Sequence, residues 1–453
     1  MLESRNPATG ALVTNCKEHD GREVAQRLTA ATTAFPAWRE LGFPARAQLL
    51  RAAARELRTH RDEYARLVTE EMGKPIAQAE AEIEKCAWGC EYYAEHGERF
   101  LAPEVIATDA ARSLVRYEPM GAVFAVMPWN FPFWQVCRFA APALMAGNVG
   151  LLKHASNVPR CALALEELFR AAGFPAGVFS TLLVSARAAE SVIPHPAIAA
   201  VTLTGSEAAG MAVAAAAGQA LKKVVLELGG SDPFVVLADA DLEAAATTAV
   251  EARMVNNGQS CIAAKRFIAV EAVADEFETR FAEKIAALKV GDPMDRTTQV
   301  GPLARADLVR DLDNQVKASV AAGAKAVVGG GPLPGRGHYF APTLLTGVRP
   351  GMPVFDQETF GPVAALIRAR DEAEAVALAN RTSYGLGASL WTRDVARGEA
   401  IAARIEAGLV FVNGMVKSDP RLPFGGVKRS GHGRELGALG IREFVNAKTV
   451  WIA

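Results

Sequence analysis

The sequence predicts an α/β protein built on open, doubly wound parallel sheets. Apolar runs of strand length alternate with helical segments, as in the strands expected at 121–127 and 149–152. With 453 residues the chain exceeds what one hydrophobic core usually supports, so two or three domains are expected. Because open α/β sheets bind ligands at the carboxyl ends of their strands, the residues at the strand exits are the first candidates for a site.

Composition narrows the class of partner. The 49 basic and 50 acidic residues give a net charge of -1, so neither nucleic acid nor an anionic membrane is expected as a partner. Six scattered cysteines fit a reducing compartment, and the pair Cys86 and Cys90 has no nearby second pair or histidine, so no metal site is expected. The N-terminus lacks an apolar signal segment, and no apolar run reaches the roughly 20 residues of a membrane span, so a cytoplasmic protein is expected.

The N-terminal part is expected to be helical over residues 21–98, where apolar residues recur every three or four positions. Its charges are interpreted as a solvated helix face and receive no chemical role. Strands are expected at 113–118 and 121–127. The second strand ends in the aromatic turn 128–132, which leaves the amide of Asn130 at the strand exit.

Two further strand exits follow. The strand 149–152 leads through residues 153–159 into a helix at 160–172, and the strand 200–204 ends at Gly205 and Ser206. These two residues begin a helix whose free N–H groups suit a phosphate, although an ordinary loop is the alternative. Neither a GxGxxG fingerprint nor a P-loop is present, so the common Rossmann type of nicotinamide enzyme is not indicated.

Glu227 and Cys261 are the two candidates for chemistry. Glu227 ends the strand expected at 222–228, where burial would raise its pKa toward that of a general base; a cap on the following Gly-Gly turn is the alternative. Cys261 follows a helix at 242–255 and a polar segment. A turn or helix start there, with cations nearby, would favour a nucleophilic thiolate, whereas a buried core cysteine is the alternative.

The C-terminal half repeats the alternation. Strands are expected at 234–237, 267–270 and 409–413, with a helix at 273–288. Residues 357–362 place a carboxylate and an aromatic residue before another apolar strand, and a polar loop and short strand span 381–390. The long loop 415–435 is rich in glycine, proline and cations, which is typical of functional loops, and a last strand covers 447–452.

Six motifs in this order resemble those of the aldehyde dehydrogenase family. They are PWNFP at 128–132, TGS at 204–206, ELGG at 227–230, GQSC at 258–261, ETFGP at 358–362 and PFGG at 423–426. Within the family the chain most resembles the short bacterial succinate-semialdehyde dehydrogenases. That resemblance rests on KHASNVP at 153–159, GQSCIAAKRF at 258–267 and SDPRLPFGG at 418–426.

The resemblance implies an oxidation in which Cys261 attacks the aldehyde to form a thiohemiacetal. The Asn130 amide and the Cys261 backbone N–H would hold its oxyanion. Hydride transfer to the nicotinamide would leave a thioester, which Glu227 would hydrolyse by activating water, so that the product is a free acid.

The resemblance also implies a dinucleotide. Trp129 and Asn130 would border the nicotinamide, Gly205 and Ser206 the pyrophosphate, and Glu358 the nicotinamide ribose. Lys153 would hold the adenosine ribose, and Ser156, in place of a glutamate, implies NADP as the preferred cofactor and NAD as a weaker one. The cofactor-binding residues implied are Trp129, Asn130, Lys153, His154, Ala155, Ser156, Gly205, Ser206, Leu228, Glu358 and Phe360.

For the substrate, an aldehyde with a carboxylate tail, the resemblance implies contacts from Arg138 and Ser418. An arginine that some relatives carry is replaced here by Val255, and Arg253 lies on another helix face. The alternatives are a surface role for Arg138, another aliphatic or amino aldehyde as substrate, and a binding protein without catalysis.

The implied aldehyde dehydrogenase fold has three units. A dinucleotide-binding domain would cover 1–108 and 122–229, and a catalytic domain 230–418. A small antiparallel extension would cover 109–121 and 436–453. Because its exposed edges need pairing, a homodimer or homotetramer is expected.

Overall fold

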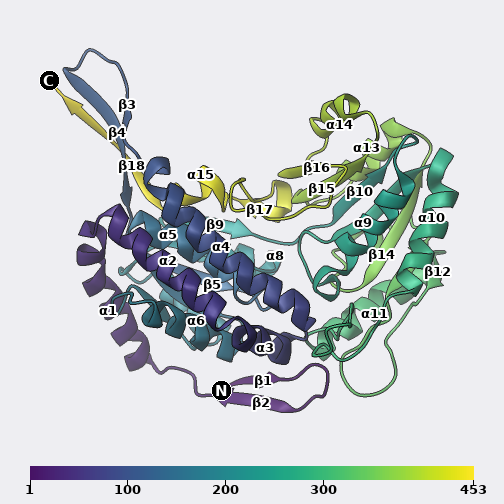
Figure 1. The fold of residues 1–453 in the computed structure, drawn as a ribbon, viewed down its shortest axis with the longest axis horizontal. Coiled ribbons are helices and arrows are strands. Elements are labelled where there is room, and N and C mark those ends of the chain that lie inside the picture. The colour runs from purple at the N-terminus through teal and green to yellow at the C-terminus, as the bar shows by residue number, and fades with distance from the viewer.

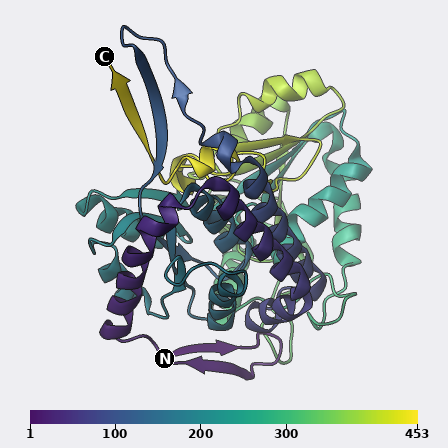
Figure 2. The ribbon, with the colours of Figure 1, turned by 60° about the vertical axis from the view of Figure 1, so that its left-hand side comes forward.

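The computed structural model describes residues 1–453 and contains two α/β bodies side by side (Figure 1). A narrow antiparallel arm, which carries the C-terminus, projects from the first body (Figures 1 and 2). This arrangement confirms the predicted fold class of open α/β sheets with a small antiparallel extension. No helix in it combines the length and the apolar character that crossing a lipid bilayer requires.

The first body contains a six-stranded sheet in the order β17-β9-β8-β5-β6-β7, parallel except for β17. β5 lies between β6 and β8, so the chain proceeds from β5 to one edge of the sheet and then returns to build the other edge. Such a switch point is where an open sheet leaves room for a ligand. The strands are β5 (Ala122–Met127), β6 (Val149–His154), β7 (Phe179–Thr181), β8 (Ile198–Thr204), β9 (Lys223–Glu227) and β17 (Gly431–His432).

Helices cover this sheet, and the stretch expected to be helical divides into four of them. The breaks occur at Gly42, His60 and the Gly73–Pro75 segment. At the first and third breaks, glycine and proline disfavour helix continuation or begin a new helix. The helices are α1 (Gly21–Glu40), α2 (Phe43–Thr59), α3 (Arg61–Met72), α4 (Ile76–Phe100), α5 (Trp134–Ala146), α6 (Pro159–Ala171), α7 (Ala186–Val192), α8 (Glu207–Gln219) and α15 (Gly437–Ile441).

Helix α5 has no solvent-exposed face, because all of its residues are buried. It packs against α4 and carries a proline, Pro142, in its interior. Because it lacks the exposed polar face that marks an amphipathic surface helix, its bounds were not predicted from the sequence.

The second body contains a seven-stranded sheet in the order β12-β13-β14-β11-β10-β15-β16, parallel except for β12. Its strands are β10 (Asp232–Val236), β11 (Ala264–Val270), β12 (Lys325–Val328), β13 (Thr343–Thr346), β14 (Val363–Ala369), β15 (Gly387–Trp391) and β16 (Leu409–Val412). Its helices are α9 (Leu242–Met254), α10 (Glu271–Ala286), α11 (Ala306–Ala321), α12 (Pro353–Asp356), α13 (Glu372–Asn380) and α14 (Val395–Ala402).

The carboxyl end of the first sheet faces the amino end of the second sheet. Asn130 and Ser206 follow the carboxyl ends of β5 and β8, whereas Cys261 and Glu358 precede the amino ends of β11 and β14. Only the four residues 228–231 join β9 to β10, so the carboxyl end of the first sheet and the amino end of the second lie close together. The candidate residues therefore gather between the two bodies.

The arm is a three-stranded sheet of β3 (Glu104–Val105), β4 (Arg112–Pro119) and β18 (Val445–Ile452). β18 pairs antiparallel with the whole of β4, from Val445 opposite Pro119 to Ile452 opposite Arg112. A second hairpin, β1 (Leu2–Arg5) with β2 (Leu12–Cys16), was not expected from the sequence. The boundaries predicted between the three units stay predictions.

Candidate active site

Cys261 lies in a turn between the 3-10 helix η1 (Val255–Gly258) and β11, not at a helix start. Asn256 and Asn257 adopt left-handed backbone conformations, with φ of 54° and 59°, and Gly258 follows with φ of 75°. Asparagine and glycine tolerate this region better than other residues. The Asn-Asn-Gly sequence therefore lets the chain reverse direction immediately before the cysteine.

Side-chain amides hold this loop in place. Asn256 Nδ2 donates to the carbonyl oxygens of Asn130 at 2.7 Å and Gln259 at 2.9 Å. Asn257 Nδ2 donates to the carbonyl oxygen of Gly73 at 2.9 Å. Both asparagines are fully buried, so their amides join the nucleophile loop to the turn after β5 and to the end of α3.

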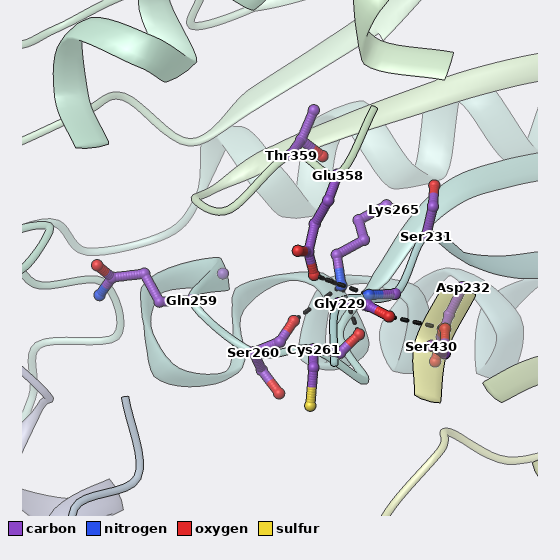
Figure 3. A network of polar contacts seen from close by, with 12 residues as sticks. Gly229, Ser231, Asp232, Gln259, Ser260, Cys261, Lys265, Glu358, Thr359 and Ser430 are labelled. Atoms are coloured by element: carbon purple, nitrogen blue, oxygen red, sulfur yellow. Dashed lines mark hydrogen bonds and ion pairs between the residues drawn. The ribbon is translucent and has the colours of Figure 1, made fainter. Parts of the chain in front are cut away.

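Lys265 fixes the loop from the other side (Figure 3). Its Nζ donates to the carbonyl oxygens of Ser260 at 2.8 Å and Cys261 at 2.6 Å, and it lies 3.5 Å from Glu358 Oε1. Glu358 Oε1 also accepts from the Gly230 N–H at 3.0 Å. The carbonyl of Cys261 points to the ammonium while its sulfur points away from it (Figure 3), which leaves the thiol free for chemistry.

Burial raises the pKa of the Cys261 thiol to about 12. Arg138 and Lys265 act in the opposite direction, as expected for nearby cations, but their effect is smaller. The resting cysteine is therefore a neutral thiol at neutral pH, and its reaction as a nucleophile requires a group that accepts its proton.

A cavity of about 230 Å³, here called the sheet-edge cavity, lies on one side of Cys261. It begins at the switch point between β5 and β8 and extends to the amino end of β14. Trp129 and Phe360 meet edge to face at 5.8 Å on its wall. Of the predicted cofactor residues it brings together Trp129, Asn130, Gly205, Ser206, Leu228, Glu358 and Phe360.

Asn130 is oriented by its neighbours. Its Oδ1 accepts from Gln135 Nε2 at 3.1 Å, and its Nδ2 donates to the carbonyl of Gln259 at 3.1 Å. Because a side-chain amide carries two N–H groups, the second stays available beside Cys261. The Cys261 N–H donates no hydrogen bond to another group of the protein. Two unused donors thus lie at the nucleophile.

The other four predicted cofactor residues lie along the end of β6 and outside this cavity. Lys153 is buried and makes no ion pair, and burial lowers its pKa. His154 is also buried; its Nε2 donates to the carbonyl of Pro132 at 2.9 Å, and burial lowers its pKa to about 4. The His154 side chain therefore supports the turn after β5. Ala155 is half-buried and Ser156 is exposed in the turn before α6.

These features fit a dinucleotide. Ser206 caps α8, where its side chain accepts from the Ala209 N–H at 3.3 Å, and this helix end lies at the switch point of the sheet. Buried in β6, the ammonium of Lys153 lacks a carboxylate, so it suits an anionic ligand. These residues would hold a dinucleotide along the carboxyl ends of β5, β6 and β8.

A second cavity of about 240 Å³, here called the helix-side cavity, lies on the other side of Cys261 between α4, α5 and the loop after β16. Arg138 lines it, but the alternative of a surface role is wrong, since this side chain is only 3% exposed. Its Nε pairs with Glu435, and its guanidinium lies 4.4 Å from the centre of the Phe424 ring. Arg138 is therefore a buried, ion-paired cation.

Ser418 lines the same cavity. Its Oγ accepts from Lys85 Nζ at 2.7 Å and from Trp134 Nε1 at 2.9 Å. Val255 also lines this cavity, whereas Arg253 is fully buried behind the loop and donates to the Gly258 carbonyl at 2.6 Å. The expectation that Arg253 does not replace the missing arginine fits this placement.

Glu227 ends β9 and lines neither cavity. Its carboxyl is buried, and its two oxygens have no hydrogen-bond partner. Gly425, with φ of 148°, lies next to this carboxyl and has no side chain that would crowd it. Burial, reinforced by the nearby Glu435, raises the pKa of Glu227 well above its usual value. An unpaired carboxyl of high pKa at this place is available to accept or carry a proton.

Sequence reasoning missed Lys85 and Arg305, which line the two cavities, and Glu435, which pairs with the cavity-lining Arg138. Lys85 was placed on a solvated helix face, Glu435 received no role, and Arg305, whose guanidinium lies 5.5 Å from the Trp129 ring centre, was not considered. None belongs to a local motif. Their proximity depends on contacts between distant segments, so the sequence offered no local signal for them.

The chain was compared with known proteins. The sequence pattern of the aldehyde dehydrogenase family matches residues 1–450. A Synechocystis protein named "Probable succinate-semialdehyde dehydrogenase (NADP+)" is 57% identical over 448 residues, 99% of each chain. A succinate-semialdehyde dehydrogenase (NADP+) of Mycobacterium avium is 52% identical over 451 residues, 99% of this chain and 96% of that one.

A solved structure gives the same result for the fold. Succinic semialdehyde dehydrogenase from Streptococcus pyogenes, in complex with NADP+ as the cofactor, superposes with a TM-score of 0.98 at 37% identity, over 100% of both chains. With a family match over nearly its full length and this agreement in fold, the chain belongs to the aldehyde dehydrogenase family.

Proposed function

We propose that this protein oxidises succinic semialdehyde to succinate and reduces NADP. The observation that carries the proposal is the position of Cys261 at the junction of two cavities. One cavity fits a dinucleotide, and the other presents cations and a hydroxyl group that suit a carboxylate tail. The names of the relatives, which specify this substrate and cofactor, support the same assignment.

In the proposed reaction the Cys261 sulfur attacks the aldehyde carbon, and the thiol proton passes to a base. The second N–H of the Asn130 amide and the Cys261 backbone N–H stabilise the oxyanion of the thiohemiacetal, because both are unused donors beside the sulfur. Asn130 is already held by Gln135 and Gln259, so little reorganisation is needed when charge develops.

Glu227 is the proposed base for hydrolysis of the thioester. Its carboxyl makes no hydrogen bond, so none would be broken if it turned toward Cys261 to take a proton from the attacking water. Hydrolysis breaks the carbon–sulfur bond, releases the acid and returns the thiol. Arg138 and Glu435 lie near enough to Glu227 to affect its pKa in opposite directions.

The dinucleotide supplies the acceptor for the two electrons and the hydrogen that leave the aldehyde carbon. Trp129, Leu228, Glu358 and Phe360 would hold its nicotinamide half, and Gly205 with Ser206 its pyrophosphate. We propose that Lys153 and Ser156, with support from His154 and Ala155, favour NADP over NAD. No acidic side chain occupies position 156 to repel a 2′-phosphate.

Initial rates test the proposal directly. With NADP, succinic semialdehyde is expected to exceed propanal by about a hundredfold in kcat/KM, which corresponds to about 2.7 kcal/mol of transition-state binding. The same substrate with NAD is expected to react more slowly. Equal rates with propanal, or with an amino aldehyde, would instead assign the enzyme to another aldehyde.

We also propose that the protein forms a homodimer or homotetramer through the arm, in a reducing compartment such as the cytoplasm. Trp451 and Ile452 in β18 are 54% and 47% exposed, and an apolar edge strand of this kind needs a partner. All six cysteines are free thiols. Light scattering of the full chain and of a variant with Trp451→Lys and Ile452→Lys tests the assembly, since the variant is expected to dissociate.

A further inference from the structure

The helix-side cavity contains more cations than carboxylates. Lys74 pairs with Glu82, and Arg138 pairs with Glu435, so the charges of these four side chains are balanced. Lys85 lines the cavity and makes no ion pair. Because a buried charge without a partner is costly, an unbalanced ammonium at a cavity wall indicates an anionic ligand.

Lys85 is held in a defined position. It extends from α4, its Nζ lies 4.6 Å from the centre of the Trp134 ring, and it donates to Ser418 Oγ at 2.7 Å. The side chain is half-buried. Lys417, the other cation of this cavity without an ion pair, is exposed and has no such contacts. Lys85 is thus oriented by its surroundings, whereas Lys417 is not.

Ser418 completes the arrangement. Its Oγ accepts two hydrogen bonds, from Lys85 Nζ and Trp134 Nε1, and a hydroxyl has two acceptor positions and one proton. The Ser418 O–H must therefore donate to a third group. Lys85 and Ser418 together present an ammonium and an O–H donor side by side, a pattern that suits a carboxylate.

We infer that Lys85 binds the carboxylate tail of the substrate and determines specificity for it, with Ser418 as its partner. The inference rests on the proposed function. Lys85 would supply the positive charge that Val255, at the position of the missing arginine, does not supply. Arg138 is less suited to this role, because Glu435 already balances its charge.

The environment of Lys85 adds a pH dependence. Burial, assisted by Arg138, lowers the pKa of Lys85 to about 8, while Cys86, Glu82 and Asp419 act in the opposite direction. Because the ammonium loses its proton as the pH rises through this value, the KM for succinic semialdehyde is expected to rise above about pH 8. Arginine keeps its charge in this range, so Lys85→Arg is expected to lose that rise.

Kinetics of Lys85→Met with succinic semialdehyde and with butanal test the inference. Butanal has the same chain length but no carboxylate. The variant is expected to lose about 10- to 100-fold in kcat/KM for succinic semialdehyde, mainly through KM, and less than about threefold for butanal. Lys85→Arg is expected to recover part of the loss. Lys417→Met, at the other cation of this cavity without an ion pair, is expected to lose less than Lys85→Met does. Lys325→Met, at an exposed lysine of β12 that lines neither cavity, is the matched control and is expected to change either value by less than about threefold.

Three outcomes would overturn the inference: equal losses for both aldehydes in Lys85→Met, no loss for succinic semialdehyde, or a larger loss in Lys417→Met. Thermal unfolding of each variant shows whether the fold is intact. The proposed function fails separately, since in that case the unaltered protein itself would not prefer succinic semialdehyde to butanal.

Discussion

The two cavities that meet at Cys261 are built in different ways. The sheet-edge cavity is formed by short motifs at the exits of β5, β8 and β9 and before β14, and it carries few charged groups. The helix-side cavity is formed by α4, α5, the nucleophile loop and a C-terminal loop, and it carries five charged side chains. Only Gln135 and Cys261 line both.

This difference teaches how the two ligands would be selected. A dinucleotide has many groups that backbone and small polar residues can recognise, so strand exits suffice. A small aldehyde has one distinguishing group, its carboxylate, and its selection depends on which cations remain unbalanced. Reaction requires both ligands to meet at one sulfur.

The largest effect is expected at that shared sulfur. Cys261→Ala is expected to lower the rate of aldehyde oxidation by about 10⁴-fold or more, because no other nucleophile lies between the cavities. Fluorescence titration with NADPH is expected to show nearly unchanged binding. If substantial oxidation survived, the two cavities would not share a reacting centre.

The next effect concerns Glu227, which lines neither cavity. Glu227→Gln is expected to slow steady-state turnover by about a thousandfold, while rapid mixing still gives a burst of reduced cofactor equal to the enzyme concentration. Burial, reinforced by Glu435, raises the pKa of Glu227, so the ionised carboxylate that can act as a base becomes more populated as the pH rises. The wild-type rate is therefore expected to rise with pH, and the variant to lose this rise.

An unchanged turnover in Glu227→Gln would contradict its role as the base. Loss of the burst as well would indicate that Glu227 acts before the thioester forms. The first result would leave the base for hydrolysis unassigned, and the second would assign Glu227 to the attack of Cys261 on the aldehyde.

The ion pairs of the helix-side cavity are expected to affect stability. Arg138→Met leaves Glu435 buried and unpaired, which is expected to reduce the free energy of unfolding by about 3 kcal/mol. Adding Glu435→Leu is expected to restore most of it. Arg170→Met is the matched control, because it breaks an exposed pair with Glu167 and is expected to cost less than about 1 kcal/mol.

Urea unfolding of the three variants measures these differences. Equal losses in Arg138→Met and Arg170→Met would mean that the buried pair contributes no more than an exposed one. The ion pair of Arg138 with Glu435 would then be weaker, and Arg138 would be more available to bind a substrate carboxylate.

The smallest effect is expected on the dinucleotide side. Ser156→Glu places a carboxylate in the turn after β6, where it would repel a 2′-phosphate and lower kcat/KM with NADP by about a hundredfold. The value with NAD is expected to change by less than about threefold. Ser156→Gln, of similar size and without charge, is the control, and equal losses with both cofactors would remove position 156 from the recognition of NADP.

Much of the fold could be predicted from the sequence. The strands at 112–119, 122–127, 198–204 and 409–412 and the helices at 159–171 and 242–254 lie within a few residues of their expected bounds, because strand and helix periods are local properties. Local reasoning failed for α5, whose uniform burial leaves no exposed polar face, and for β6, which extends to His154 and so includes Lys153 and His154.

By itself the sequence determined the family, the chemistry implied for Cys261 and the residues at the strand exits, since these features reside in short contiguous motifs. Only the tertiary structure decided which charges are balanced. Lys85 meets Ser418 across 333 positions, and Arg138 meets Glu435 from another distant segment. The physical reason is that the effect of a charged side chain depends on its ion-pair partner and on its burial. Both are set only when distant segments pack together.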